Sequence, residues 1–95
     1  MPTYITLLRY TPQGIEKIKD SPARLEKAKA AMKAAGGEMK AFYLTMGAYD
    51  AVAISEAPSN EAYARTMLAI ASAGAVRTET LCAFGEAEYL RIVSG

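Results

Sequence analysis

The sequence predicts a single α+β domain in which a four-stranded antiparallel sheet carries two helices on one face. Apolar stretches rich in β-branched and aromatic residues alternate with alanine-rich helical segments, and glycine or proline marks most of the boundaries. The resulting order is strand, helix, strand, strand, helix, strand, which is typical of the ferredoxin-like βαββαβ sandwich. Right-handed crossovers then favour the strand order 4-1-3-2. At 95 residues the chain forms one domain over residues 1–95, because it has no room for a second core.

The first strand and the first long helix have clear boundaries. TYITLLRY, residues 3–10, is rich in β-branched and aromatic residues and predicts the first strand. A short helical turn is expected to follow Thr11. In DSPARLEKAKAAMKAAGG, Ser21 is the predicted N-cap, Pro22 suits the first helical position, and the glycine pair at Gly36 ends the helix.

A hairpin follows the first helix. EMKAFYLTM, residues 38–46, predicts the second strand, and DAVAISE, residues 50–56, predicts the third. Gly47 lies between them and is assigned as a structural turn residue, because a tight hairpin often requires a positive φ.

The last third of the chain predicts a helix, a strand and a terminal helix. The second long helix begins at Pro58-Ser59-Asn60 and ends at Gly74. AVRTETLCAF, residues 75–84, alternates in the manner of a strand. GEAEYLRIV predicts a short terminal helix, with Glu86 and Glu88 near its start, where the helix dipole favours negative charge.

Strand alternation divides the sheet residues into two sets. Bulky aliphatic residues form the first set, which is expected to pack beneath the helices: Ile5, Leu7, Val52, Ile54 and Leu81. The second set is uncharged, with aromatic, hydroxyl and small residues: Tyr4, Thr6, Leu8, Tyr10, Tyr43, Thr45, Tyr49, Ala51, Ala53, Ser55, Thr78, Thr80, Cys82 and Phe84. A sheet face that meets water normally carries more charge. We therefore expect a homodimer formed by sheet-to-sheet packing of the second set, with a cavity between sheet and helices or between subunits; a monomer with a mildly apolar face is the alternative.

Composition excludes several classes of function. Eleven Lys and Arg against ten Asp and Glu give a formal charge of +1, without a basic run, so nucleic acid is not an expected partner. The chain has no histidine and one cysteine, Cys82, so neither a metal site nor a cofactor is expected. Cys82 is interpreted as a small buried residue rather than a nucleophile. The absence of a signal segment or a long apolar run predicts a soluble, cytoplasmic protein without a membrane association.

The deduced topology brings residues from three strands to one end of the sheet. Strand 1 ends at Arg9, strand 3 begins at Tyr49 and Asp50, and strand 4 begins at Arg77, with Tyr43 nearby. We call this group the hairpin rim, and it is the predicted ligand-binding site. Two interpretations stay open. In one, Asp50 only accepts hydrogen bonds from turn amides or an arginine. In the other, the arginines bind an anionic or carbonyl oxygen of a ligand, because a guanidinium matches such oxygens with two parallel hydrogen bonds.

The segments TMGAYDAVAISEAP and VRTETLCAF, extended by YITLLRYTPQGIEKIKDSPARL, resemble the GYD-domain family of small bacterial proteins. The Gly-Tyr-Asp element corresponds to Gly47-Ala48-Tyr49-Asp50, with one residue between the glycine and the tyrosine. The resemblance covers nearly the whole chain and implies a dimeric α/β barrel of uncharacterised function. Besides that element, it implies that Arg77 and Thr78 are characteristic positions. Haem-handling and many oxygenase members of the wider barrel group use a histidine, which this chain lacks.

The expected function is therefore a homodimer that binds a small molecule at the hairpin rim. A cofactor-independent enzyme of the isomerase or oxygenase type, acting on an aromatic or carboxylated metabolite through Tyr49, Asp50 and an arginine, is the alternative. A subunit that only binds other proteins is the third interpretation. Whether the protein is an enzyme is left open by the sequence, because arginines beside Asp50 weaken it as a general base.

Overall fold

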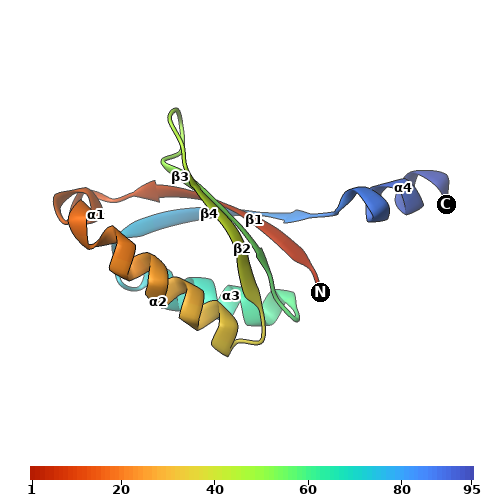
Figure 1. Cartoon of the computed structure of the whole chain (residues 1–95), viewed down its shortest axis with the longest axis horizontal. Coiled ribbons are helices and arrows are strands. Elements are labelled where there is room, and N and C mark those ends of the chain that lie inside the picture. The colour runs from red at the N-terminus through yellow and green to blue at the C-terminus, as the bar shows by residue number, and fades with distance from the viewer.

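The computed structural model describes residues 1–95 and contains one four-stranded sheet with helices before, between and after its strands (Figure 1). The elements in chain order are β1 (Thr3–Tyr10), α1 (Pro12–Glu16), the 3-10 helix η1 (Ile18–Asp20), α2 (Ser21–Ala34), β2 (Glu38–Leu44), β3 (Ala51–Glu56), α3 (Asn60–Ala71), β4 (Val76–Ala83) and α4 (Glu86–Ser94). Every predicted strand and helix is present, with boundaries that differ by a few residues.

The sheet is antiparallel throughout, and its strands lie in the order β2-β3-β1-β4, which is 4-1-3-2 read from the opposite edge. Helices α2 and α3 both lie on one side of the sheet, whereas the hairpin between β2 and β3 extends on the other side (Figure 1). The central strand β1 pairs with β3 and β4, so that Thr6 lies between Ala53 and Thr80. A small α+β fold of the ferredoxin-like type is therefore present.

The turn residues behave as their chemistry predicts at most boundaries. Gly47 has φ +134° and Gly74 has φ +82°, both in the region that favours glycine. Ser59 caps α3, because its hydroxyl accepts a hydrogen bond of 3.2 Å from the Ala62 amide. The predicted N-cap at Ser21 is wrong: η1 leads directly into α2, so Ser21 is already helical and Asp20 occupies the cap position.

The predicted orientation of the two sheet faces is wrong. Tyr4, Thr6, Ala53 and Ser55, from the uncharged set, are buried beneath α2 and α3. The aliphatic set instead lies on the side without helices. We call this side the open face; it comprises Ile5, Leu7, Arg9, Tyr43, Val52, Ile54, Arg77, Glu79 and Leu81. A period of two separates two faces but is symmetric between them, so it does not say which one meets the helices.

The core lies at one end of the layer between sheet and helices. It consists of Tyr4, Met32, Ala57 and Tyr63, each at most 4% exposed, with Met67 packed against them. The Tyr4 and Tyr63 rings stack with centroids 4.0 Å apart and an interplanar angle of 13°. Tyr4 from β1 and Tyr63 from α3 fill the layer at this end together with Met32 of α2.

Helix α4 is separate from the rest of the molecule. Strand β4 continues past the sheet and carries α4 away from the body (Figure 1), and no residue of α4 is buried. The Cα radius of gyration is 14.1 Å, whereas a compact chain of this length is expected to have about 12 Å. None of the helices combines the length and the apolar character needed to cross a lipid bilayer.

A pair of methionine substitutions tests the position of the core. Met32 is fully buried, whereas Met46 at the hairpin tip is 99% exposed. We expect Met32→Ala to lower the free energy of unfolding by about 2–5 kcal/mol, because it removes buried methylene groups and leaves a cavity. Met46→Ala is the matched control and should change it by less than about 0.5 kcal/mol. Urea denaturation measures both values, and equal effects would contradict this core assignment.

Candidate functional site

A cavity of about 430 Å³ lies between the sheet and helices α2 and α3. It occupies the end of the layer away from the Tyr4–Tyr63 stack, where β1 ends and β4 begins. Twenty residues line it, fourteen of them hydrophobic. They are Thr6, Leu8, Tyr10, Ser21, Arg24, Leu25, Lys27, Ala28, Ala31, Met39, Phe42, Ala53, Ser55, Met67, Ala69, Ile70, Ala73, Ala75, Val76 and Thr78.

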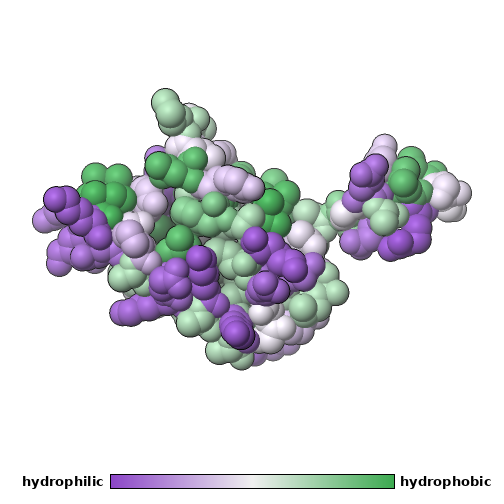
Figure 2. All heavy atoms as spheres, in the orientation of Figure 1, coloured by the Kyte–Doolittle hydropathy of each residue, from purple (hydrophilic) through white to green (hydrophobic).

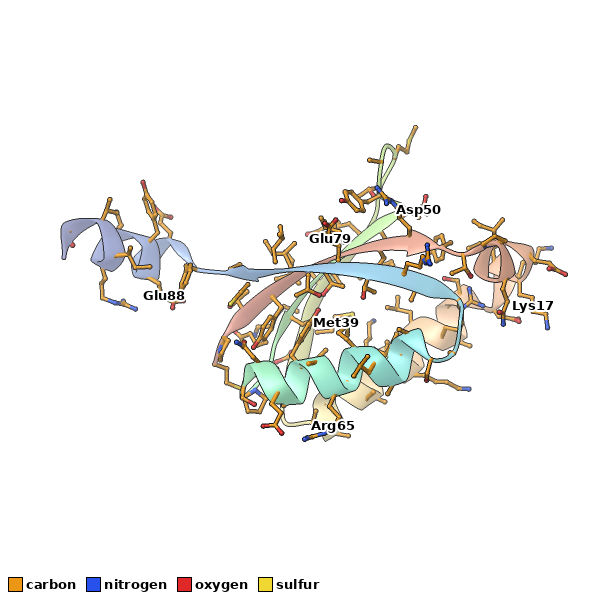
Figure 3. The ribbon with its side chains drawn as sticks, turned by 180° about the vertical axis from the view of Figure 1, so that it is seen from behind. Lys17, Met39, Asp50, Arg65, Glu79 and Glu88 are labelled. Carbon is orange, nitrogen blue, oxygen red and sulfur yellow. The ribbon has the colours of Figure 1, made fainter.

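The cavity exists because small side chains face one another across the layer. The sheet contributes Ala53 and Ser55, and the two helices contribute alanines such as Ala28 and Ala69. The larger side chains that line the cavity, among them Phe42 and Ile70, do not fill the space, whereas interiors are normally packed without voids of this size. Met39 points into the gap between the sheet and the helices (Figure 3). The volume is within the range of small-molecule sites in proteins.

The charged residues that line the cavity are both basic. Arg24 and Lys27 lie on α2, and no aspartate or glutamate lines the cavity. Arg24 donates hydrogen bonds to the carbonyl oxygens of Lys17 (3.1 Å) and Gly14 (3.3 Å), which hold its guanidinium in place and leave other N–H groups free. The electrostatics of the cavity therefore favour an apolar molecule that carries a negative group.

Hydroxyl groups form a network next to the floor of the cavity. The Tyr63 hydroxyl lies between those of Thr6 and Thr80, at 3.1 Å from the latter, and Tyr4 donates to Asn60 Oδ1 at 2.5 Å. Burial raises the pKa of the Tyr4 phenol, with smaller contributions from Cys82 and Tyr63. This network satisfies the buried hydroxyls of the sheet beneath α3. Cys82 itself is exposed, so the expectation that it is buried is wrong.

The hairpin rim contains a compact polar cluster on the open face. The Arg9 guanidinium carbon lies 4.6 Å from the centroid of the Tyr49 ring, and Arg9 Nε donates a 2.9 Å hydrogen bond to the Ala48 carbonyl oxygen. The Tyr49 hydroxyl donates to the Glu79 carboxylate. This hydrogen bond, with desolvation and the Glu79 charge, raises the pKa of Tyr49, and Arg9 opposes the shift. A more open hollow of about 340 Å³ adjoins Tyr49.

The Asp50 carboxylate forms a hydrogen bond with a backbone amide rather than with an arginine. Its Oδ2 accepts a 2.9 Å hydrogen bond from the Tyr10 amide, and its own amide donates to the Leu8 carbonyl oxygen at 2.8 Å. Its carbonyl oxygen accepts from the Thr45 amide at 2.9 Å. Asp50 therefore joins the hairpin to the end of β1, which agrees with the structural interpretation given above.

The other predicted rim residues lie apart from this cluster or at its edge. Arg77 lies directly opposite Arg9 on the open face, whereas Tyr43 lies opposite Val52 and is 59% exposed. Sequence reasoning missed Glu79, although alternation on β4 places it on the same face as Arg77. It also missed Arg24 of α2, because nothing in the sequence indicated which residues would surround the cavity. No three acidic or cysteine side chains lie close enough together to hold a metal ion.

The rim cluster leads to a prediction about ionisation. Glu79→Gln removes the carboxylate that holds the Tyr49 proton, so the pKa of Tyr49 should fall toward the ordinary tyrosine value of about 10. Arg9→Gln should raise the pKa of Tyr49 above its value in the wild type, because the Arg9 charge lowers it. Ultraviolet titration measures both shifts, and Tyr49→Phe identifies the transition. Because the folded-state pKa lies above the unfolded one, this bond stabilises the fold below about pH 10 and is lost as the pH rises through the folded-state value. An unchanged titration in Glu79→Gln would contradict the arrangement.

Solved structures share this fold. A feast or famine regulatory protein from M. tuberculosis, complexed with L-methionine, matches 90% of the chain with a TM-score of 0.68 and 19% identity. The leucine response regulatory protein of Mycobacterium tuberculosis matches 88% with a TM-score of 0.66 and 20% identity. The chain spans 51% of each of these two proteins. The protein TTHA0845 from Thermus thermophilus matches 90% of this chain and 95% of its own, with a TM-score of 0.56 and 26% identity.

Sequence comparison identifies the family. A protein from Thermus thermophilus, named as a glutamine synthetase and cystathionine beta-lyase binding protein, is 35% identical over 91 residues, which are 95% of this chain and 96% of the relative. The family model of the GYD domain matches residues 4–93, as the resemblance of the hairpin segment predicted. The chain belongs to the GYD domain family.

Proposed function

We propose that this protein is a homodimer that binds a small, largely apolar molecule with an anionic group in the cavity beneath α2 and α3. The observation that carries the proposal is a cavity of about 430 Å³ whose lining is mainly hydrophobic and whose charged residues, Arg24 and Lys27, are both basic. An aliphatic or aromatic carboxylate fits this description. The carboxylate would lie toward α2 and the apolar body between Phe42 and Ile70.

The cavity is a better candidate for the ligand than the hairpin rim that the sequence predicted. At the rim, the Asp50 carboxylate accepts a hydrogen bond from the Tyr10 amide, Arg9 lies over the Tyr49 ring, and Tyr49 donates to Glu79. A ligand there would have to replace these interactions. In the cavity, by contrast, a ligand would gain contacts that the protein does not make. We therefore assign the rim residues to the structure and surroundings of the open face.

A substitution that fills the cavity tests this proposal. Ala28 lines the cavity on α2, whereas Ala30 on the same helix is exposed and does not. We expect Ala28→Phe to occupy the space and to reduce binding of the fluorescent apolar anion 8-anilinonaphthalene-1-sulfonate by at least about tenfold, while the control Ala30→Phe binds like the wild type. Fluorescence titration measures the Kd.

The same assay reports on the charge of the ligand. Hexanoate and phenylacetate should compete with the probe, whereas the corresponding primary amides should compete more weakly, because they lack the charge that Arg24 and Lys27 attract. Probe binding that is equal in Ala28→Phe and the wild type would remove the cavity from consideration.

The surface of the chain supports association with a second copy. Its solvent-accessible surface is 6445 Å², whereas a compact monomer of 10.2 kDa is expected to expose about 5,300 Å². The excess, on the order of 1,000 Å², is comparable to the roughly 800 Å² that each partner buries in a stable interface. The open face, with Ile5, Leu7, Val52, Ile54 and Leu81, and the uncovered helix α4 are the regions that a second copy would cover.

Binding to a metabolic enzyme is a second candidate function, because the relative that is 35% identical over nearly the whole chain is named for binding glutamine synthetase and cystathionine beta-lyase. The hairpin tip is a suitable contact. Leu44 is 74% exposed and Met46 is 99% exposed, and the hairpin extends away from the body (Figure 1). An exposed methionine adapts to varied partner surfaces.

This second function is tested by mixing the purified protein with glutamine synthetase or cystathionine β-lyase from the same organism. Size-exclusion chromatography with light scattering should detect a complex at about 10 μM, a concentration suited to a micromolar Kd. Met46→Lys should weaken the complex without lowering the stability of the free protein, because the side chain is almost fully exposed. Separate elution of this protein from both enzymes would exclude this function at that concentration.

A further inference from the structure

We propose that two copies join their open faces with antiparallel strands, so that α4 of each copy crosses the hairpin end of the other and Glu86 pairs with Arg77 of the partner. This inference rests on the homodimer proposed above and adds its direction and its specificity. Three features of the chain lead to it: an uncovered helix, an uncompensated pair of arginines, and the constraint that two-fold symmetry places on both.

Helix α4 requires a partner that its own chain does not provide. It has nine residues, and isolated helices of this length are marginal in water. Tyr89, Leu90 and Val93 lie along one side and are 56–63% exposed. At 100° per residue Glu86 falls on this same side, one turn before Leu90, whereas Arg91 falls on the opposite side. A surface that covers the apolar side of α4 therefore also meets the Glu86 carboxylate.

Two arginines lie side by side at the opposite end of the open face, where the neighbouring Glu79 carboxylate accepts a hydrogen bond from Tyr49. Arg9 and Arg77 are directly opposed across β1 and β4 and both are exposed on the open face. Opposed like charges destabilise a strand pair. Arg9 contacts Tyr49 and the Ala48 carbonyl, but no acidic side chain lies within ion-pair distance of Arg77. The arginine pair is thus suited to an acidic group from outside the chain.

Two-fold symmetry allows two arrangements when identical sheet faces meet. If the axis runs along the strands, β4 of each copy lies over β2 of the other, the arginine pairs of both copies lie at one end of the dimer, and the acidic starts of both α4 helices lie at the other end. If the axis is perpendicular to the strands, the arginine end of each copy faces the α4 end of the other. The first arrangement places charges of the same sign at the same end and leaves Arg77 far from the partner's α4, whereas the second pairs opposite charges. Electrostatics therefore select the perpendicular axis.

The spacing along β4 agrees with this choice. Leu81 lies on the aliphatic part of the open face, with Arg77 four residues before it and Glu86 five residues after it. At about 3.3 Å per residue, these positions lie about 13 Å and 16 Å from Leu81. An axis that passes near Leu81 therefore superposes Glu86 of one copy on Arg77 of the other to within about one residue.

Charge reversal tests the ion pair in the full-length protein. Arg77→Glu and Glu86→Arg should each weaken dimerisation about tenfold or more in sedimentation equilibrium, because every reversal replaces two symmetry-related attractions by two repulsions. The double variant Arg77→Glu/Glu86→Arg should return to within about threefold of the wild type. Arg65→Glu on α3, which points away from the sheet (Figure 3), and Arg91→Glu on the far side of α4 are controls that should dimerise like the wild type.

The variants remain informative about folding. Arg77→Glu relieves the repulsion with Arg9, so at a concentration at which both proteins are monomeric its thermal unfolding should occur no lower than that of the wild type, and a weaker dimer then has its cause at the interface. A wild-type dimer with single variants of unchanged affinity, or with no recovery in the double variant, would overturn the α4 pairing and leave the homodimer standing. A wild type that stays monomeric would overturn both, whereas the probe titration reports on the cavity independently.

Cross-linking distinguishes the two symmetry axes. In a Cys82→Ser background, Arg77→Cys combined with Glu86→Cys should give a covalent dimer with a short bis-maleimide cross-linker, which spans the roughly 10 Å between packed sheets, and neither substitution alone should do so. A dimeric double variant that fails to cross-link, or efficient cross-linking of the Arg77→Cys variant alone, would contradict the perpendicular axis and would overturn the proposal.

Discussion

The stack of Tyr4 on Tyr63 is the contact on which the rest of the structure depends. It sets the separation of α3 from the sheet, because the two rings fill the layer with centroids 4.0 Å apart and the neighbouring polar groups of Thr6 and Asn60 hold them in place. Large side chains pack against one another at this end. At the other end half of the residues that line the cavity are alanine, serine or threonine, so the layer remains partly empty. The cavity is thus a consequence of a spacer at one end of an otherwise alanine-rich layer. Its basic charges come from the start of α2, which closes the other side.

The same distribution of side chains explains the open face. The sheet places its bulky aliphatic residues away from the helices, where the chain leaves them partly exposed, and β4 extends beyond the sheet with a helix that has no intrachain partner. Hydrophobic residues are visible across the body and on the detached α4 in Figure 2. The chain therefore has two incomplete regions, one internal and one external. A small molecule suits the first because it is enclosed and apolar, and a protein surface suits the second because it is broad and carries charges at defined positions.

The hairpin that names the family has a structural role at its centre. Asp50 joins the hairpin to the end of β1 through backbone hydrogen bonds, and Gly47 provides the positive φ of the turn. Tyr49 between them presents its ring to Arg9 and its hydroxyl to Glu79 on the open face. The three residues thus have different tasks: the glycine permits the turn, the aspartate anchors it, and the tyrosine links it to two strands of the sheet.

The sequence alone determined the elements, their order and their turns, because periodicity, caps and glycines act locally. Strand order and family membership were likewise predictable, the first from the handedness of crossovers and the second from the hairpin segment. Only the tertiary structure decided which side of the sheet the helices cover, since alternation is symmetric between the two faces and the aliphatic set looked like the better core. It also decided where space remains: the cavity depends on the separation set by Tyr4 and Tyr63, which no single segment specifies. The hydrogen bond between Tyr49 and Glu79 was likewise decided by the tertiary structure. It joins residues thirty positions apart, which only the register of the strands brings together.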